Sequence, residues 1–130
     1  MDWKDCQENR IVKDVKTDKN MINSTREIAD IKIRSAEALP GDLYIGKISL
    51  LYDALRELLE AEALERNFKI YNHECYSAFL KEVMNMSRDA DIFDRLRKTR
   101  NSINYYGKKV SEEEANKIIE DMYFLIRKFR

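Results

Sequence analysis

The sequence is poor in the residues that interrupt regular structure, with three glycines and one proline among 130 residues. An all-β fold needs many turns, and turns depend on Gly and Pro, so this shortage argues against that class. Apolar residues make up 44% of the chain, which is enough for the core of a single domain. Disorder is excluded because disordered chains combine low hydrophobicity with net charge, whereas the formal net charge here is zero. We expect one helical domain over residues 1–130, with residues 1–7 as a loose N-terminal tail.

Cysteine and histidine are also scarce, with two and one respectively. Cys6 and Cys75 lie far apart in the sequence and form no CxxC pair, and no histidines cluster near them. Neither a disulfide framework nor a metal site is indicated, and we expect two reduced thiols, no metal and no cofactor. No apolar run approaches the roughly 18 residues of a membrane helix, and residues 1–10 do not resemble a signal peptide. The expected protein is cytoplasmic and does not contact a membrane.

Apolar residues recur at helical spacing in five segments, which predicts an all-α, up-and-down bundle of about five helices. The first helix is expected over residues 8–39 and ends where Pro40-Gly41 stops it. The second, over residues 42–67, is the most apolar and is the predicted centre of the core. Residues 68–71 are interpreted as a connector and not as a strand.

Capping residues mark the remaining boundaries. Asp42 is expected to cap the second helix and Asn72 the third, and polar residues 87–91 are expected to separate the third helix from the fourth. Gly107 ends the fourth helix in the manner of a C-terminal glycine. Ser111 and Glu114 match a capping box at the start of the fifth helix.

The zero net charge is the sum of two opposed regions. Residues 53–65 carry five acids and one base, whereas the acid-free segment 95–111 carries six bases. At about 100° per residue, Arg100 lies roughly 40° from Leu96, at the edge of the apolar stripe of its helix. Arginine is rarely buried without a partner. Arg100 is therefore expected either to pair with an acid of the second helix, Glu57 or Glu60, or to form an anion site.

The other bases of this segment are predicted to face water. Arg95, Arg97 and Lys98 fall further round the helix from the apolar stripe. Asn104 lies one turn after Arg100 and can share its face. Of the two adjacent tyrosines only one can face inward, and Tyr106 is the nearer to the apolar stripe.

The segment from Arg100 to Gly107, RNSINYYG, resembles the motif of the HEPN domain family (higher eukaryotes and prokaryotes nucleotide-binding). That motif is an Arg, commonly followed by a polar residue, with a His four to six positions beyond that polar residue. Residues 44–59 resemble the family's long second helix. Residues 67–74, with the pair Asn72-His73, resemble its connector into the third helix. The resemblance covers residues 8–130.

The resemblance implies a homodimer in which two copies of the motif face each other. Catalytic members are metal-independent endoribonucleases, in which the Arg stabilises phosphate charge and the His moves protons. Arg100 and Asn101 match the start of the motif, with Arg97 and Asn104 as further phosphate contacts. Tyr105, Tyr106 and Gly107 stand where the His belongs. Tyrosine has a pKa near 10 and is a poor base at pH 7.

Some members of this family are toxins whose partner, a small nucleotidyltransferase, adenylylates a tyrosine near the motif. The sequence leaves three hypotheses open. The favoured one is a nucleotide- or RNA-phosphate-binding module partnered with such a nucleotidyltransferase in a toxin-antitoxin-like system. The second is a metal-independent endoribonuclease toxin that uses Arg100 with Tyr105 or Tyr106. The third is a helical scaffold without ligand. His73 is expected to cap a helix or to pack.

Overall fold

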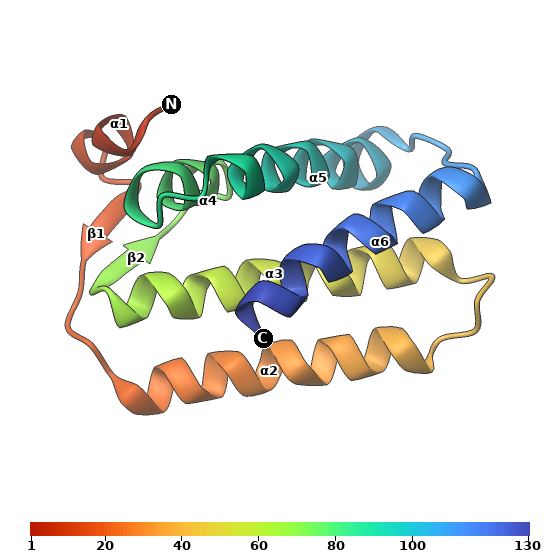
Figure 1. Ribbon diagram of the computed structural model, residues 1–130, viewed down its shortest axis with the longest axis horizontal. Helices are drawn as coiled ribbons and strands as arrows, with labels where there is room; N and C mark the ends of the chain where they lie inside the picture. The colour runs from red at the N-terminus through yellow and green to blue at the C-terminus, as the bar shows by residue number, and fades with distance from the viewer.

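The computed structural model describes residues 1–130 and is a mostly helical bundle with one small sheet (Figure 1). The expectation of a mostly helical fold is therefore confirmed. None of the helices combines the length and the apolar character that crossing a membrane demands. The elements in chain order are α1 (Trp3–Glu8), β1 (Val12–Asp14), α2 (Lys19–Ala38), α3 (Tyr44–Glu65), β2 (Phe68–Ile70), α4 (Glu74–Ala78), a π-helical turn η1 (Phe79–Val83), α5 (Ser87–Tyr106) and α6 (Glu112–Phe129).

Helix α3 is the centre of the core, as its apolar sequence predicts. It lies between α2 on one side and α5 on the other, and α6 packs against α3 and α5 (Figure 1). Its fully buried side chains include Leu51, Tyr52, Leu55 and Leu59. Burial of a leucine side chain contributes roughly 1.5–3 kcal/mol, so this helix supplies much of the hydrophobic free energy of folding. Asp42, the expected cap, makes no capping hydrogen bond to α3.

The expected first helix over residues 8–39 is wrong in its N-terminal third. Helix α2 begins only at Lys19, because Asp18 caps it by accepting hydrogen bonds from the backbone N–H groups of Asn20 (2.9 Å) and Met21 (3.3 Å). Asp18 interrupts the apolar stripe of the sequence, and this interruption is the true start of the helix. The predicted end before Pro40 is confirmed, with Leu39 as the C-terminal cap.

The segment that precedes α2 forms a strand, and so does the predicted connector after α3. Strands β1 and β2 pair antiparallel, with Val12 opposite Ile70 and Asp14 opposite Phe68. Each strand has only three residues, so neither shows a period-2 pattern long enough to be recognised in the sequence. The pairing partner lies more than 50 residues away and decides the structure of both segments.

Residues 1–7, expected as a loose tail, instead form helix α1 and its cap. Asp2 caps α1 in a reciprocal capping box with Asp5. A disulfide joins Cys6 of α1 to Cys75 of α4, with the two Cα atoms 6.1 Å apart. The expected pair of reduced thiols is therefore wrong, because the fold brings two distant cysteines together and the sequence separation could not show it. The cytoplasmic location stays a prediction, now without the support of reduced thiols.

The boundaries of α5 and α6 are partly as predicted. Helix α5 begins at Ser87, so the predicted polar break at residues 87–91 is wrong and the break lies before it. Its end at Gly107 is confirmed, with φ of 63° in the left-handed region that favours glycine. Ser111 caps α6 by accepting from the backbone N–H of Glu114 at 3.1 Å.

Candidate functional site

Arg100 belongs to α5, and its side chain, which is 16% exposed, lies between α5 and α3. Its guanidinium group stands over the ring of Tyr52, 5.1 Å from the centroid, and 3.6 Å from a carboxylate oxygen of Asp53. Its Nε is buried and has no hydrogen-bond partner. The expected acid partner was Glu57 or Glu60, and this is wrong. Asp53 lies one turn earlier on α3 and takes that place.

The two acids expected to hold Arg100 bind other bases. Glu57 pairs with Lys32 of α2, and its carboxylate lies 3.6 Å from Arg56. Glu60 pairs with Lys69 of β2 and, at 3.3 Å, with Arg56. The helical wheel of a single helix could not reveal Lys32 and Lys69, because they belong to α2 and β2, which pack on α3 from other sides.

Three arginines place positive charge near one aromatic side chain of α3: Arg100 stands over the ring of Tyr52, and the charges of Arg56 and Arg97 also act on it. Tyr52 and Arg56 lie one turn apart on α3, and Arg97 and Arg100 lie about one turn apart on α5, so each pair shares a helix face. The positive charges of all three arginines act on the titration of Tyr52 and of His73. We call this set the arginine cluster: Tyr52, Asp53, Arg56, His73, Arg97 and Arg100.

Arg97 was predicted to face water and is instead largely buried, with its side chain 16% exposed. Its Nε and Nη2 both donate to one carboxylate oxygen of Asp94, at 3.1 and 2.9 Å. Although burial opposes it, hydrogen bonds from Arg97 and Lys98 lower the pKa of Asp94. Arg95 and Lys98 are exposed as predicted. Burial of Arg97 follows from the packing of α4 against α5, which the periodicity of α5 alone does not contain.

His73, the only histidine, belongs to the same cluster as Arg100. Its Nδ1 lies 3.1 Å from the hydroxyl of Tyr52, and its ring packs on Tyr52 and Tyr76 at centroid distances of 5.8 and 6.2 Å. The packing role is confirmed. His73 also occupies the N-cap position of α4, but its side chain makes no capping hydrogen bond, and it is the side chain of Asn72 that accepts from the backbone N–H of Glu74 at 2.8 Å. The sequence did not predict that His73 lies near Arg100, because the two residues are far apart in the chain and belong to different elements.

The environment of the cluster keeps its imidazole neutral. Burial lowers the pKa of His73 to about 4, and the charges of Arg56 and Arg100 act in the same direction. Burial likewise raises the pKa of Tyr52 to about 12, in spite of the nearby Arg100. At pH 7 the hydroxyl of Tyr52 is therefore protonated and can donate its hydrogen bond to Nδ1 of the neutral His73.

The lowered pKa of His73 predicts a specific loss of stability in acid. The unfolded chain binds a proton at its histidine near pH 6.5, before the folded protein does, so stability present above that pH falls as the pH drops toward about 4. The variant His73→Gln lacks this proton linkage. Its thermal midpoint, measured by calorimetry, should run parallel to that of the unaltered protein above pH 7 and fall less steeply between pH 6.5 and 4. Curves that stay parallel through this window would contradict the assignment.

The C-terminal turn of α5 is open to solvent. Tyr105 is 70% exposed, and its ring centroid lies 5.9 Å from the guanidinium of Arg100. Tyr106 is 83% exposed, so its expected core packing is wrong, because α5 ends at the next residue and only Ile103 of its last turn is buried. Asn101 places its amide oxygen 3.5 Å from Arg100 Nη1, while Asn104 is exposed and joins no contact of the cluster. The structure thus gathers Arg97, Arg100, Asn101 and Tyr105, and leaves Asn104 and Tyr106 outside.

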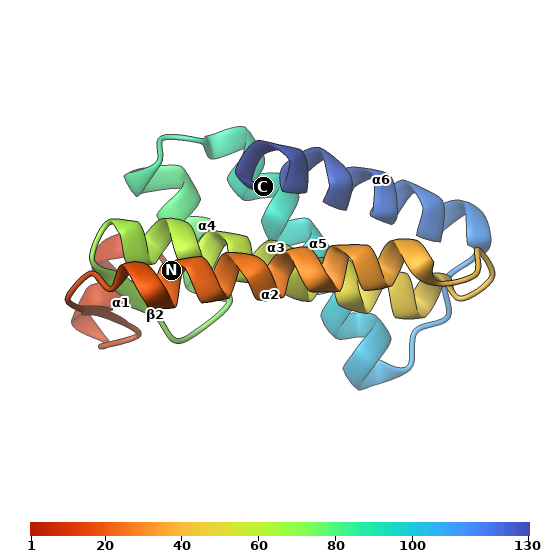
Figure 2. The same cartoon turned by 90° about the horizontal axis from the view of Figure 1, so that it is seen from below.

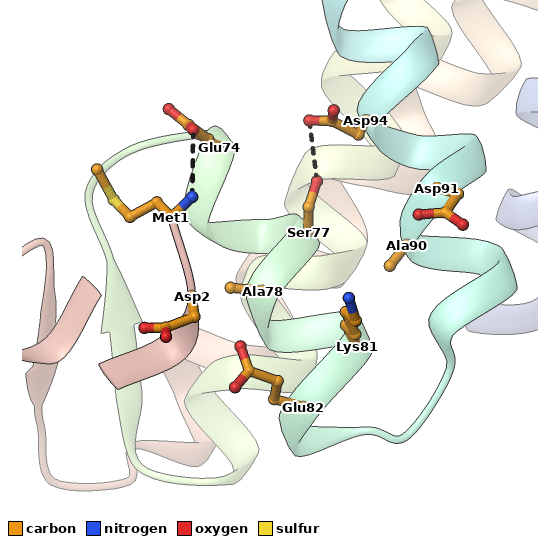
Figure 3. A pocket seen from close by; sticks show the side chains of 10 residues that line it. All are labelled: Met1, Asp2, Glu74, Ser77, Ala78, Lys81, Glu82, Ala90, Asp91 and Asp94. Carbon is orange, nitrogen blue, oxygen red and sulfur yellow. Dashed lines mark hydrogen bonds and ion pairs between the residues drawn. The ribbon is translucent and has the colours of Figure 1, made fainter. Parts of the chain in front are cut away.

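A neighbouring hollow of about 460 Å³ lies between the start of α1, α4, η1 and α5 (Figure 3). Its rim is acidic, with Asp2, Glu74, Glu82 and Asp91 beside the Asp94 that holds Arg97. No group of His, Cys, Asp and Glu side chains is arranged to hold a metal ion. Because carboxylates repel phosphate, this acidic hollow is not a suitable site for a phosphate group.

Comparison of the chain with protein-family models, with curated proteins and with solved structures finds no match. A function has to be argued from the arginine cluster itself.

Proposed function

We propose that this protein is a HEPN-type module that binds a phosphate group of a nucleotide or RNA at Arg100. The observation that carries the proposal is the incomplete bonding of this side chain. Its buried Nε has no partner, its Nη1 reaches only the amide oxygen of Asn101 at 3.5 Å, and its single carboxylate neighbour lies at 3.6 Å, longer than a hydrogen bond. A guanidinium group has five donors in a planar fork, and phosphate oxygens can accept them in pairs.

The surroundings of Arg100 hold this fork in one orientation. Tyr52, fully buried, lies under the guanidinium plane, and the exposed Tyr105 lies near it on the solvent side. Cation–π contact with a desolvated ring contributes up to about 2 kcal/mol and fixes the plane before a ligand arrives. Arg56 and Arg97 add positive charge nearby, although each already has carboxylate partners.

The resemblance also suggests the partners. A minimal nucleotidyltransferase in a toxin-antitoxin-like system would act on a tyrosine near Arg100, and the exposure of Tyr105 and Tyr106 supports access to their hydroxyl groups. A homodimer of the kind implied by the family would bring two Arg100 side chains to one phosphate.

The proposal is tested by titrating a 5′-nucleotide or a short RNA into the protein at fixed, low ionic strength. Arg100→Ala is expected to weaken binding by about 10- to 100-fold, as loss of a charge-assisted hydrogen-bonding group does. Asp53→Asn removes the acid that competes for Arg100 and should tighten binding. Lys98→Ala is the matched control, because it removes one exposed positive charge from the same helix. Equal losses for Arg100→Ala and Lys98→Ala would contradict a site at Arg100.

An endoribonuclease is the second candidate, and the position of His73 favours it. The imidazole that the motif lacks on α5 is supplied to the same cluster by the start of α4. A neutral imidazole can accept the proton of a 2′-hydroxyl as its oxygen attacks phosphorus and the 5′-oxygen leaves, but burial lowers the pKa of His73 to about 4, which makes it a weak base at pH 7. RNA in the same titrations, held in excess chelator, should then be cleaved by the unaltered protein but not by Arg100→Ala or His73→Gln. RNA that stays intact would contradict the endoribonuclease and leave phosphate binding as the proposed function. If Arg100→Ala lowers only stability and changes no binding, the Arg100–Asp53 pair belongs to a scaffold.

A further inference from the structure

Helix α2 carries two uncharged faces, and only one of them is covered. The inner face is buried against α3 and consists of Ile22, Ala29, Ile33 and Ala36. A second line of uncharged residues, which we call the outer stripe, is exposed along its whole length: Met21, Ser24, Ile28, Ile31, Ser35 and Ala38.

The outer stripe has the spacing of a helix-pairing seam. Its members follow one another at alternating steps of three and four residues, which is the a/d pattern of a coiled coil. At about 100° per residue its centre lies roughly 140° from the inner face. Met21, Ile28 and Ile31 are 51%, 48% and 52% exposed, where a surface helix normally carries polar groups. Every other exposed residue of α2 is polar or charged.

Nothing in the chain itself covers this stripe. Helix α2 forms one edge of the bundle, and in the view from below it is the helix nearest the reader (Figure 2). Arg26 and Lys32 attach α2 to α3, and Asp30 accepts from Arg130 at the end of α6, and none of these residues belongs to the outer stripe. The stripe therefore faces outward.

We propose that the outer stripe binds a second copy of this chain, with the two α2 helices antiparallel about a two-fold axis near Ala29 and Asp30. The stripe is complementary to itself in this arrangement. Ile28 meets Ile31 of the partner subunit at the centre. At the ends, the large Met21 meets the small Ala38 of the partner subunit.

The polar members of the stripe fit the same pairing. Ser24 lies opposite Ser35 of the partner subunit, and small side chains let two helices approach closely. The hydroxyl of Ser35 already donates to the backbone carbonyl of Ile31 at 2.8 Å. This donor is therefore satisfied when water is excluded.

Charges beside the stripe select the antiparallel orientation. Glu27 and Arg34 flank the same side, so each Glu27 reaches Arg34 of the partner subunit, and the symmetry forms this pair twice. Glu27 makes no ion pair within the chain, and Arg34 contacts only its exposed neighbour Asp30. In a parallel pair, Glu27 would instead have to pair with Lys32 of the partner subunit, and Lys32 is already bound to Glu57 of α3.

This interface is distinct from the homodimer considered under Proposed function, in which two Arg100 side chains would share one phosphate, and it does not depend on phosphate binding. Helix α5 lies on the far side of α3 from α2 (Figure 1), so the arginine cluster stays outside the contact. A single helix pair of about 26 Å buries an area at the low end for protein interfaces, so the dimer should be weak and depend on concentration.

Sedimentation equilibrium over a wide range of protein concentration tests the proposal. The unaltered protein is expected to pass from monomer to dimer. Ile28→Glu should weaken this dimer by at least about tenfold, because it buries a charge at the centre of the seam. Ile45→Glu changes another exposed isoleucine, on α3, and should leave the dimer unchanged. A protein that stays monomeric, or equal effects of the two variants, would overturn the proposal.

A charge exchange tests the register. Glu27→Arg and Arg34→Glu should each weaken the dimer, since each places like charges together, and the double variant should restore it. Failure of the double variant to restore the dimer would overturn the antiparallel pairing. Circular dichroism shows whether each variant is folded. Arg100→Ala should dimerise like the unaltered protein, which separates this result from that of the phosphate titration.

Discussion

Reduction of the Cys6–Cys75 disulfide is expected to lower the free energy of unfolding by about 4 kcal/mol. The bridge joins residues 69 positions apart, so breaking it releases a long loop in the unfolded chain and raises its conformational entropy. For a protein of this size the thermal midpoint should fall by roughly 15 °C. Calorimetry with and without a thiol reductant measures the shift, with free thiols quantified in each sample.

Local structure should respond first at the N-terminus. Helix α1 has six residues, too few to be stable alone, and besides the disulfide it is held by Trp3, whose ring packs on Phe68 and Phe79 at 5.1 and 5.8 Å. Amide exchange of α1 should therefore accelerate after reduction. The double variant Cys6→Ala/Cys75→Ala is the control, because reductant should not shift its midpoint. An unchanged midpoint in fully reduced protein would show that aromatic packing, and not the bridge, holds α1.

Phe93→Ala is expected to cost about 4 kcal/mol, at the upper end for a single core substitution. The side chain of Phe93 is fully buried, stacks on Tyr52 at a centroid distance of 5.9 Å, and meets the edge of Tyr76 at 6.2 Å. Its removal leaves a cavity under the ring that supports Arg100. Phosphate binding should therefore weaken together with stability.

Urea unfolding measures this loss, with two comparisons. Phe93→Leu keeps most of the volume and should cost only about 1 kcal/mol. Phe124→Ala removes the same side chain from an exposed position of α6 and should cost less than 1 kcal/mol. Equal losses for Phe93→Ala and Phe124→Ala would contradict the central position of Phe93 in the core.

Boundaries that depend on neighbouring residues could be predicted from the sequence. Gly107 ends α5 because glycine adopts the left-handed conformation at little cost, and Ser111 starts α6 because its hydroxyl accepts from the backbone three residues later. The apolar stripe of α3 likewise predicted the centre of the core. Each of these features is a property of one helix and its caps.

Features that need a distant partner were missed. Val12 extends because Ile70 pairs with it, and Cys6 is oxidised because α1 returns to α4. Arg97 was placed in water because the periodicity of α5 does not show that α4 packs beside it.

The features of the candidate site likewise divide into those that the sequence determines and those that need a distant partner. The sequence by itself determined that a helical chain carries Arg100 at the edge of an apolar stripe, within an acid-free segment, because these are properties of order and spacing along one helix. Only the tertiary structure decided that Asp53 is its acid neighbour and that His73 belongs to the same cluster. Burial and charge pairing depend on which helices meet. That meeting is governed by the packing of α3, α4 and α5 as a whole, through contacts between residues far apart in the chain.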